Sequence, residues 1–216
     1  MNTDELIRML GTSFEREPAR SSRMTARIGL AAAVATVLAL CLAMLALGLR
    51  PDLAEGRALA FLMAKIAFVG TVGGLALTYL GKLMRPGGEG RVHLGLAALP
   101  FAVMMGLAGI SLAFAPPMHW GSMVSGHSWI ECLVSIPVIG IVPFTILMWV
   151  VRRIGAPTDL VRTGAFVGLV SGAVSALGYA FHCMDDTVPF VAVWYGGTLA
   201  LCTLAGALLG PRLLRW

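Results

Sequence analysis

Long apolar runs separated by short polar segments cover almost the whole chain after residue 26. A helix needs about 20 apolar residues to cross the roughly 30 Å hydrocarbon core of a bilayer. Runs of this kind predict six spans, near 28–49, 58–81, 92–114, 130–151, 160–182 and 188–210. Backbone groups in lipid need partners within the chain, and the sequence lacks the period-two alternation of a β-barrel. The pattern predicts an all-α integral membrane protein with six transmembrane helices.

Composition supports this class and divides the chain into two parts. Of 216 residues, 58% are hydrophobic and 12% are charged, and the mean hydropathy is +0.85, values that exclude an ordinary soluble domain. The spans require residues 27–216, which we expect to form one transmembrane domain. Residues 1–26 are too few to bury a core of their own, so we expect a short N-terminal tail.

The basic residues predict how the spans are oriented. Basic loops are retained on the cytoplasmic side of a membrane. With the N-terminus inside, thirteen basic residues face the cytoplasm: Arg8, Arg16, Arg20, Arg23, Arg27, Lys82, Arg85, Arg91, Arg152, Arg153, Arg162, Arg212 and Arg215. The outer loops hold only Arg50 and Arg57. Both termini are therefore predicted to be cytoplasmic. The net charge of +5 reports topology rather than direct nucleic-acid binding, because it is spread along a membrane boundary.

The tail has the pattern of a short amphipathic helix. Its apolar face is formed by Leu6, Ile7, Leu10 and Phe14. Such a helix is marginal alone, so it either lies on the membrane surface or binds a hydrophobic groove of a cytoplasmic partner. The pattern leaves both alternatives open. Pro18 and the Ser21–Ser22 pair predict the end of this helix and a flexible tether before the first span.

Two cysteines are predicted to lie at a similar depth near the outer surface. Cys132 starts the fourth span and Cys183 ends the fifth, so the two thiols could be neighbours, with His182, Asp185 and Asp186 as supporting groups. Thiolate and imidazole suit zinc or copper, which makes Cys132, Cys183 and His182 candidate metal ligands, and two thiols can also form a disulfide. The plainer alternatives are a structural disulfide or isolated apolar thiols. Cys41 and Cys202 lie within spans and are predicted to be packing residues.

Two further features of the spans favour structural roles. Lys65 is a charge well inside the second span, and its side chain is expected to reach toward the outer end, with Glu131 or Asp185 as a candidate partner. Small residues recur at every fourth position of the fifth span, at Gly164, Gly168 and Gly172. This spacing predicts close helix packing within the bundle, with dimerisation as the weaker alternative.

Two other classes of protein are alternatives. A small polytopic transporter would place several polar groups near the midplane of the membrane, where this sequence has mainly Gly, Ser, Thr and Pro. A membrane redox or metal-binding protein would carry a C-x-x-C motif or facing histidines, and the sequence has neither. We therefore expect no enzymatic activity.

Five short segments carry a family resemblance. They are "TDELI" (3–7), "APT" (156–158), "GYAFHCMDD" (178–186), "WY" (194–195) and "GPRLLRW" (210–216). In these segments the chain resembles the NrsF-type membrane anti-sigma factors, negative regulators of extracytoplasmic-function sigma factors in proteobacteria. The C-terminal set is the more specific, whereas residues 30–125 agree chiefly in hydropathy and span count.

The resemblance implies a function for both ends of the molecule. It implies a bacterial inner-membrane protein whose tail sequesters an extracytoplasmic-function sigma factor in the cytoplasm, with Leu6, Ile7, Leu10 and Phe14 as anchors. It also places Cys132 and Cys183 where the family keeps stress-responsive cysteines. Oxidation or a transient thiophilic metal ion would then release the sigma factor, and no resident cofactor is required. The extra cysteines, Cys41 and Cys202, leave open which thiols respond.

Overall fold

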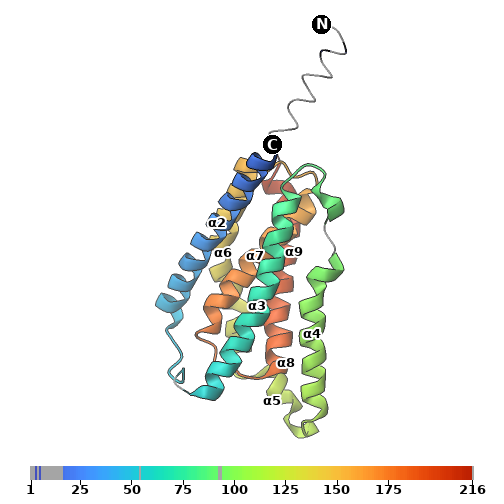
Figure 1. Cartoon of the computed structure of the whole chain (residues 1–216). Coiled ribbons are helices and arrows are strands. Elements are labelled where there is room, and N and C mark those ends of the chain that lie inside the picture. The colour runs from blue at the N-terminus through green and yellow to red at the C-terminus, as the bar shows by residue number, and fades with distance from the viewer. Residues whose placement is uncertain (1–2, 4, 6–16, 54, 92–93, 216) are drawn as a thin grey trace.

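The computed structural model describes residues 3, 5, 17–53, 55–91 and 94–215. In this part of the chain the secondary structure is helical, and the long helices run up and down alongside one another (Figure 1). The long helices are α2 (Glu17–Leu47), α3 (Gly56–Leu83), α4 (Leu94–Ala113), α6 (Trp129–Ile154), α7 (Leu160–Ala180) and α9 (Gly196–Leu213). Short segments join them: η2 (Gly88–Arg91), η3 (Pro117–His119), α5 (Trp120–Ser125), α8 (Val188–Phe190) and η4 (Val191–Tyr195).

Six helical stretches of the described chain are long and apolar enough to cross a membrane, as the hydropathy pattern predicts. Two of them are compound. The stretch that contains α6 starts at Pro117 and includes η3 and α5, a region that was predicted to be a loop. The last stretch begins with α8 and with η4, a π-helical turn, before α9 continues it.

The predicted tether before the first span is wrong. Helix α2 begins at Glu17 and runs without a break through Pro18 and the Ser21–Ser22 pair into the first apolar stretch. Proline is tolerated in the first turn of a helix, where its missing N–H would have no intrahelical acceptor, so Pro18 fits the first turn of α2. The predicted tail helix, with Leu6, Ile7, Leu10 and Phe14, lies outside the described residues.

Helix α7 is the centre of the bundle. It packs against α2, α3, α6 and α9. In its apolar stretch 72% of the residues are buried, whereas in the peripheral α4 only 6% are. The small residues predicted to pack closely make the contact between α7 and α9: a Cβ added at Gly168 would overlap the carbonyl oxygen of Cys202, and one at Gly206 the carbonyl oxygen of Gly164. The prediction of close packing within the bundle is confirmed, because only hydrogen atoms fit between these backbones.

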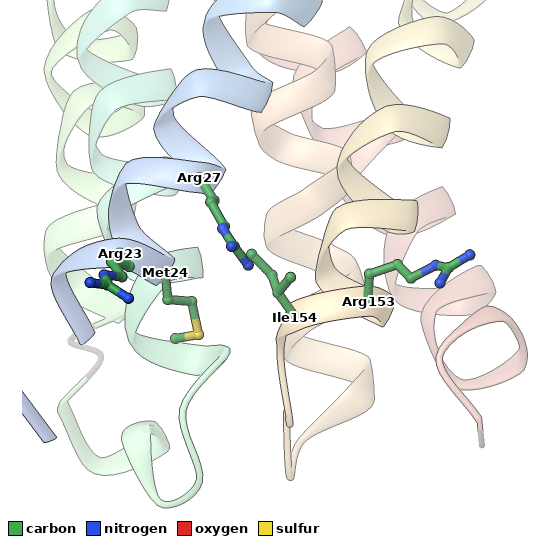
Figure 2. A pocket seen from close by; sticks show the side chains of 5 residues that line it. All are labelled: Arg23, Met24, Arg27, Arg153 and Ile154. Atoms are coloured by element: carbon green, nitrogen blue, oxygen red, sulfur yellow. The ribbon is translucent and has the colours of Figure 1, made fainter. Parts of the chain in front are cut away.

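The two ends of the bundle differ in charge. At the basic end lie the start of α2, the end of α6 and the C-terminal end of α9 (Figure 1). Arg23 and Arg27 of α2 line a pocket there with Arg153 of α6, and Met24 and Ile154 complete its wall (Figure 2). The opposite end, which we call the cysteine end, holds residues 48–53, α5 and residues 181–187 (Figure 1). Arg23, Arg27 and Arg153, which were predicted to lie on one side of the membrane, are therefore found at one end of the bundle.

Candidate functional site

The candidate site is built on residues 181–187, which connect α7 to α8 at the cysteine end. Phe181 ends α7, and the N–H groups of His182 and Cys183 still donate to the carbonyl oxygen of Tyr179. Thr187 then caps α8, where its side chain accepts from the N–H of Phe190. Between these two points the backbone is irregular, so Cys183, Asp185 and Asp186 can face in different directions.

Cys132 and Cys183 lie in one buried cluster. Cys132 is in the first turn of α6 with an exposed fraction of 0%, and Cys183 follows α7 with 1% exposed. Both belong to the same buried core, and Ser128 Oγ, at the start of α6, lies 3.9 Å from the sulfur of Cys183. Within the described part of the chain all four cysteines are free thiols. The structure thus brings the two predicted cysteines together, in a place shielded from solvent.

Asp186 anchors an ion cluster beside the thiols. Its carboxylate accepts from Arg50 Nη2 at 2.6 Å and from Lys65 Nζ at 2.8 Å, and Arg50 also donates to Asp52 at 2.7 Å. The side chains of Arg50 and Lys65 are 0% and 1% exposed. Such buried charges need hydrogen-bonded partners of opposite sign. Asp186 is such a partner for both Arg50 and Lys65.

The ion cluster shifts the pKa values of its members. Burial acts to raise the pKa of Asp186, but hydrogen bonds from Arg50 and Lys65 outweigh it and hold this pKa below its usual range. Hydrogen bonds to Asp52 and Asp186 raise the pKa of Arg50 further above its ordinary value. Both shifts favour the charged forms, so Asp186 and Arg50 are ionised at neutral pH.

The same two cations also hold the backbone of Cys183. Its carbonyl oxygen accepts from Lys65 Nζ at 3.0 Å and from Arg50 Nη1 at 3.1 Å. The N–H of Arg50 donates to the carbonyl oxygen of Phe181 at 3.1 Å. Residues 181–186 are therefore fixed to α3 and to the connection between α2 and α3. A movement of Cys183 would have to disturb these contacts.

Asp185 fixes the other side of the segment to α6. Its carboxylate accepts from the N–H of Ser128 at 2.8 Å, from the N–H of His127 at 3.1 Å, and from the hydroxyl of Ser128. These groups lie at the start of α6, where unpaired N–H groups and the helix dipole favour an anion. Burial acts to raise the pKa of Asp185, but the hydrogen bonds from Ser128 and His127 lower it.

His182, one of the three predicted metal ligands, makes a backbone contact in the structure. The ring Nδ1 of His182 lies 3.3 Å from the carbonyl oxygen of Gly48, a backbone contact at the end of α2. Among the residues that the structure describes, no three His, Cys, Asp or Glu side chains gather closely enough to hold a metal ion. A thiophilic ion would therefore rely on the two thiolates of Cys132 and Cys183.

Two tyrosines complete the cluster. Tyr179 in the last turn of α7 and Tyr195 at the end of η4 are both fully buried, with ring centroids 6.2 Å apart. The π-helical turn of η4 also contains Trp194, whose Nε1 donates to the carbonyl oxygen of Val124 at 2.8 Å and so attaches α5 to the bundle. π-Helical turns are frequent at functional sites.

Several predictions about single residues can now be compared with the fold. Lys65 does reach toward the cysteine end, but its partner is Asp186 and neither Asp185 nor Glu131. Cys202 packs against Gly172 as predicted, whereas Cys41 is exposed, so the packing role predicted for Cys41 is wrong. Sequence reasoning missed Arg50, which it treated only as a topology signal. An arginine in a loop otherwise poor in basic residues, facing two aspartates, was the available signal.

Six helices long and apolar enough to cross a membrane, with a buried cluster of two thiols and an ion network at one end, define a helical bundle of the membrane-protein type. Comparison with known proteins identifies the family. The family model described as "NrsF: Negative regulator of sigma F" matches residues 13–216, so the chain belongs to this family. The resemblance found in the sequence is confirmed. Membership indicates a regulatory role and disfavours the transporter and redox-enzyme alternatives.

Two relatives match over their full lengths. The chain is 35% identical over 221 residues to the anti-sigma-F factor NrsF of Caulobacter vibrioides, and the match covers 100% of both chains. It is 31% identical over 218 residues to the probable anti-sigma-F factor NrsF of Azospira oryzae, again with 100% of both chains covered. No solved structure matches the chain.

Proposed function

We propose that this protein is a multi-pass inner-membrane anti-sigma factor that sequesters an extracytoplasmic-function sigma factor through residues 2–16 and releases it when Cys132 and Cys183 react. The observation that carries the proposal is the full-length relation to two anti-sigma-F factors. The polar cluster around the two cysteines supports the second part, because it gives the thiols a defined environment within the fold.

The arrangement of charges supports a membrane topology with both termini in the cytoplasm. Six described stretches have the length and hydropathy of membrane spans. The basic end, with Arg23, Arg27 and Arg153, would face the cytoplasm under the positive-inside rule. The cysteine end would then face the periplasm, an oxidising compartment in which thiols can report stress.

The input we propose is oxidation of the two thiols. Forming a disulfide between Cys132 and Cys183 removes two protons and two electrons, which a hydroperoxide accepts as its O–O bond breaks to give water and an alcohol. A disulfide is worth about 2–4 kcal/mol, and moving a two-state protein from 1:99 to 99:1 takes about 5.5 kcal/mol. Oxidation alone would therefore bias the switch. A thiophilic metal ion on the two thiolates is a second input.

Helix α2 is the element that would carry the signal. Its 31 residues make a rod of about 46 Å at 1.5 Å per residue, from Glu17 beside the tail to Leu47 beside the cysteine cluster. The residues that follow α2 contact residues 181–187. The carbonyl oxygen of Gly48 lies beside the ring of His182, and Arg50 donates to Asp186 and to the carbonyl oxygen of Cys183. A displacement of Cys183 would therefore act on the C-terminal end of α2, and the N-terminal end of the same helix carries the proposed sigma-binding tail.

The sigma-binding part of the proposal is tested by co-purification. We expect the full-length protein, extracted from the membranes of its own bacterium, to retain one sigma factor identified by mass spectrometry. A variant lacking residues 2–16 should lose it, because this deletion removes the predicted apolar face and leaves α2 complete from Glu17. Exchange of Leu10→Glu should have the same effect, whereas Thr12→Glu, on the opposite face, should not. Retention of the sigma factor by the deletion variant would contradict the assignment of the tail.

A further inference from the structure

Three arginines from two helices line one pocket at the basic end of the bundle. Arg23 and Arg27 stand four residues apart on α2, and Arg153 is in the last turn of α6. Arg27 extends from α2 toward Ile154 of α6 (Figure 2). The pocket has a volume of about 360 Å³. Ligand sites commonly measure about 300–1,000 Å³, so this pocket has room for a small polar group.

These arginines gather without a described counter-charge. None of the ion pairs between residues that the structure describes includes Arg23, Arg27 or Arg153. Side chains four residues apart on a helix are neighbours, and like charges at this spacing repel each other. The helix dipole favours a cation in the last turn of α6, but it does not act on the α2 pair, which lies beyond the first turn. An anion bound between the two helices would offset the repulsion among all three arginines.

The side chains next to the pocket place it at the level of lipid headgroups. Trp149, one turn before Arg153, is exposed, and the Arg153 guanidinium lies 5.4 Å from the centroid of its ring. Exposed tryptophans of membrane proteins are enriched at the boundary between headgroups and hydrocarbon. On α2 the arginines are followed by Leu30 and Val34, which are exposed and apolar, as expected for a surface that faces lipid. A lipid that lies against this part of α2 would carry its headgroup at the level of the pocket.

We propose that the pocket formed by Arg23, Arg27 and Arg153 binds the phosphate group of an anionic phospholipid. Guanidinium groups remain charged at neutral pH and bind phosphate oxygens through paired N–H donors. Basic pockets between transmembrane helices on the cytoplasmic side of membrane proteins bind anionic headgroups in this way. The bound phosphate would link the start of α2 to the end of α6. The inference rests on the membrane placement proposed above, and it does not depend on the sigma factor or on the cysteines.

The test is a lipid titration of the full-length protein in a non-ionic detergent, with bound phosphatidylglycerol measured by native mass spectrometry. Phosphatidylcholine, which has the same phosphate but no net charge, is the comparison lipid, and the parent protein should prefer phosphatidylglycerol. We expect the Arg23→Gln, Arg27→Gln variant to bind phosphatidylglycerol at least about tenfold more weakly than the parent, a change of about 1.4 kcal/mol. Both side chains are exposed, so the variant should fold, with a thermal midpoint in lipid-free detergent close to that of the parent.

Two arginines outside the pocket provide the matched control. Arg212 is in the last turn of α9, Arg215 follows that helix, and neither lines the pocket, although both lie at the same end of the bundle (Figure 1). The Arg212→Gln, Arg215→Gln variant has the same net charge as the pocket variant and should bind phosphatidylglycerol as the parent does. Equal losses of affinity in the two variants, or equal affinity of the parent for the two lipids, would overturn the proposal.

A third arm of the experiment separates a lipid from other anions. Inorganic phosphate at millimolar concentration should leave phosphatidylglycerol bound, whereas displacement would assign the pocket to a soluble phosphate and overturn the lipid assignment. A pocket variant that binds the lipid normally but loses the sigma factor would assign the arginines to the protein partner instead. Recovery of the protein in the membrane fraction before extraction tests the membrane placement separately, so its failure and a failure of lipid binding are distinguishable.

Discussion

Replacing Asp186 by asparagine is expected to destabilise the folded protein by about 3–5 kcal/mol, the range seen when one partner of a buried ion pair is removed. The carboxylate is the shared partner of Arg50 and Lys65, whose side chains are 0% and 1% exposed. An amide leaves both cations in a low-dielectric site with one negative charge fewer. Equilibrium unfolding of the detergent-solubilised protein, followed by circular dichroism, measures the loss.

Asp52 offers a matched aspartate in the same cluster. It pairs with Arg50 alone and is 31% exposed, so Asp52→Asn leaves Arg50 with Asp186 and should destabilise the protein much less than Asp186→Asn does. Adding Lys65→Met to Asp186→Asn removes one of the unpaired cations and should restore part of the stability. Equal losses for Asp52→Asn and Asp186→Asn would contradict the assignment of Asp186 as the anchor.

The pKa shifts of the same carboxylates give this cluster a pH dependence with a definite sign. The native pKa values of Asp185 and Asp186 lie below the unfolded value of about 3.9. Their contribution to stability is therefore fully present above this value and is lost as the pH falls through the lowered native values. The difference in stability between the parent and Asp186→Asn should shrink between about pH 5 and pH 2.

Exchanging both Cys132 and Cys183 for serine is expected to abolish the response to oxidant. Serine fits where a buried thiol was and cannot be oxidised to a disulfide, so the sigma factor should remain bound under stress. In the native bacterium, a transcriptional reporter for the sigma factor should stay at its uninduced level in the double variant. In the parent, the reporter signal should rise by at least about tenfold under the same exposure, a change that corresponds to about 1.4 kcal/mol in the equilibrium of the switch.

The remaining cysteines are the control for this experiment. Cys41 is exposed on α2, and Cys202 packs on α7 near Gly172, away from the cysteine end. A variant with Cys41→Ala and Cys202→Ala should induce as the parent does. Normal induction of the Cys132→Ser, Cys183→Ser variant would show that these thiols are not the input.

The parts of the fold that follow from local pattern were predictable from the sequence. Apolar runs predicted the helices α3, α6 and α7 to within a few residues, because the length of a span is set by the membrane and not by a particular partner. The same reasoning placed Cys132 and Cys183 at a common depth, since each stands near the end of a span. The direction of Lys65 followed from the geometry of the Cα–Cβ bond on a helix.

The parts that depend on irregular backbone could not be predicted. Asp185 and Asp186 are neighbours in sequence, yet one binds the start of α6 and the other the cations of α3 and the α2–α3 connection. Hydropathy carries no information on how residues 181–187 turn. The buried state of Arg50 and the π-helical turn that ends at Tyr195 arise from the same tertiary contacts. Pro18 was read as a helix end because its place in a first turn depends on where the helix begins.

The most direct test of a switch that joins the cysteine end to the tail uses the isolated complex. The full-length protein, held in lipid discs with its sigma factor bound, is exposed to a hydroperoxide, and the sigma factor that remains bound is measured against time. We predict retention by the reduced protein, release on oxidation, and retention by the Cys132→Ser, Cys183→Ser variant under the same oxidant. Equal retention by the parent protein before and after oxidation of both thiols would contradict the proposed coupling, and failure of the reduced protein to bind any sigma factor would contradict the anti-sigma function itself.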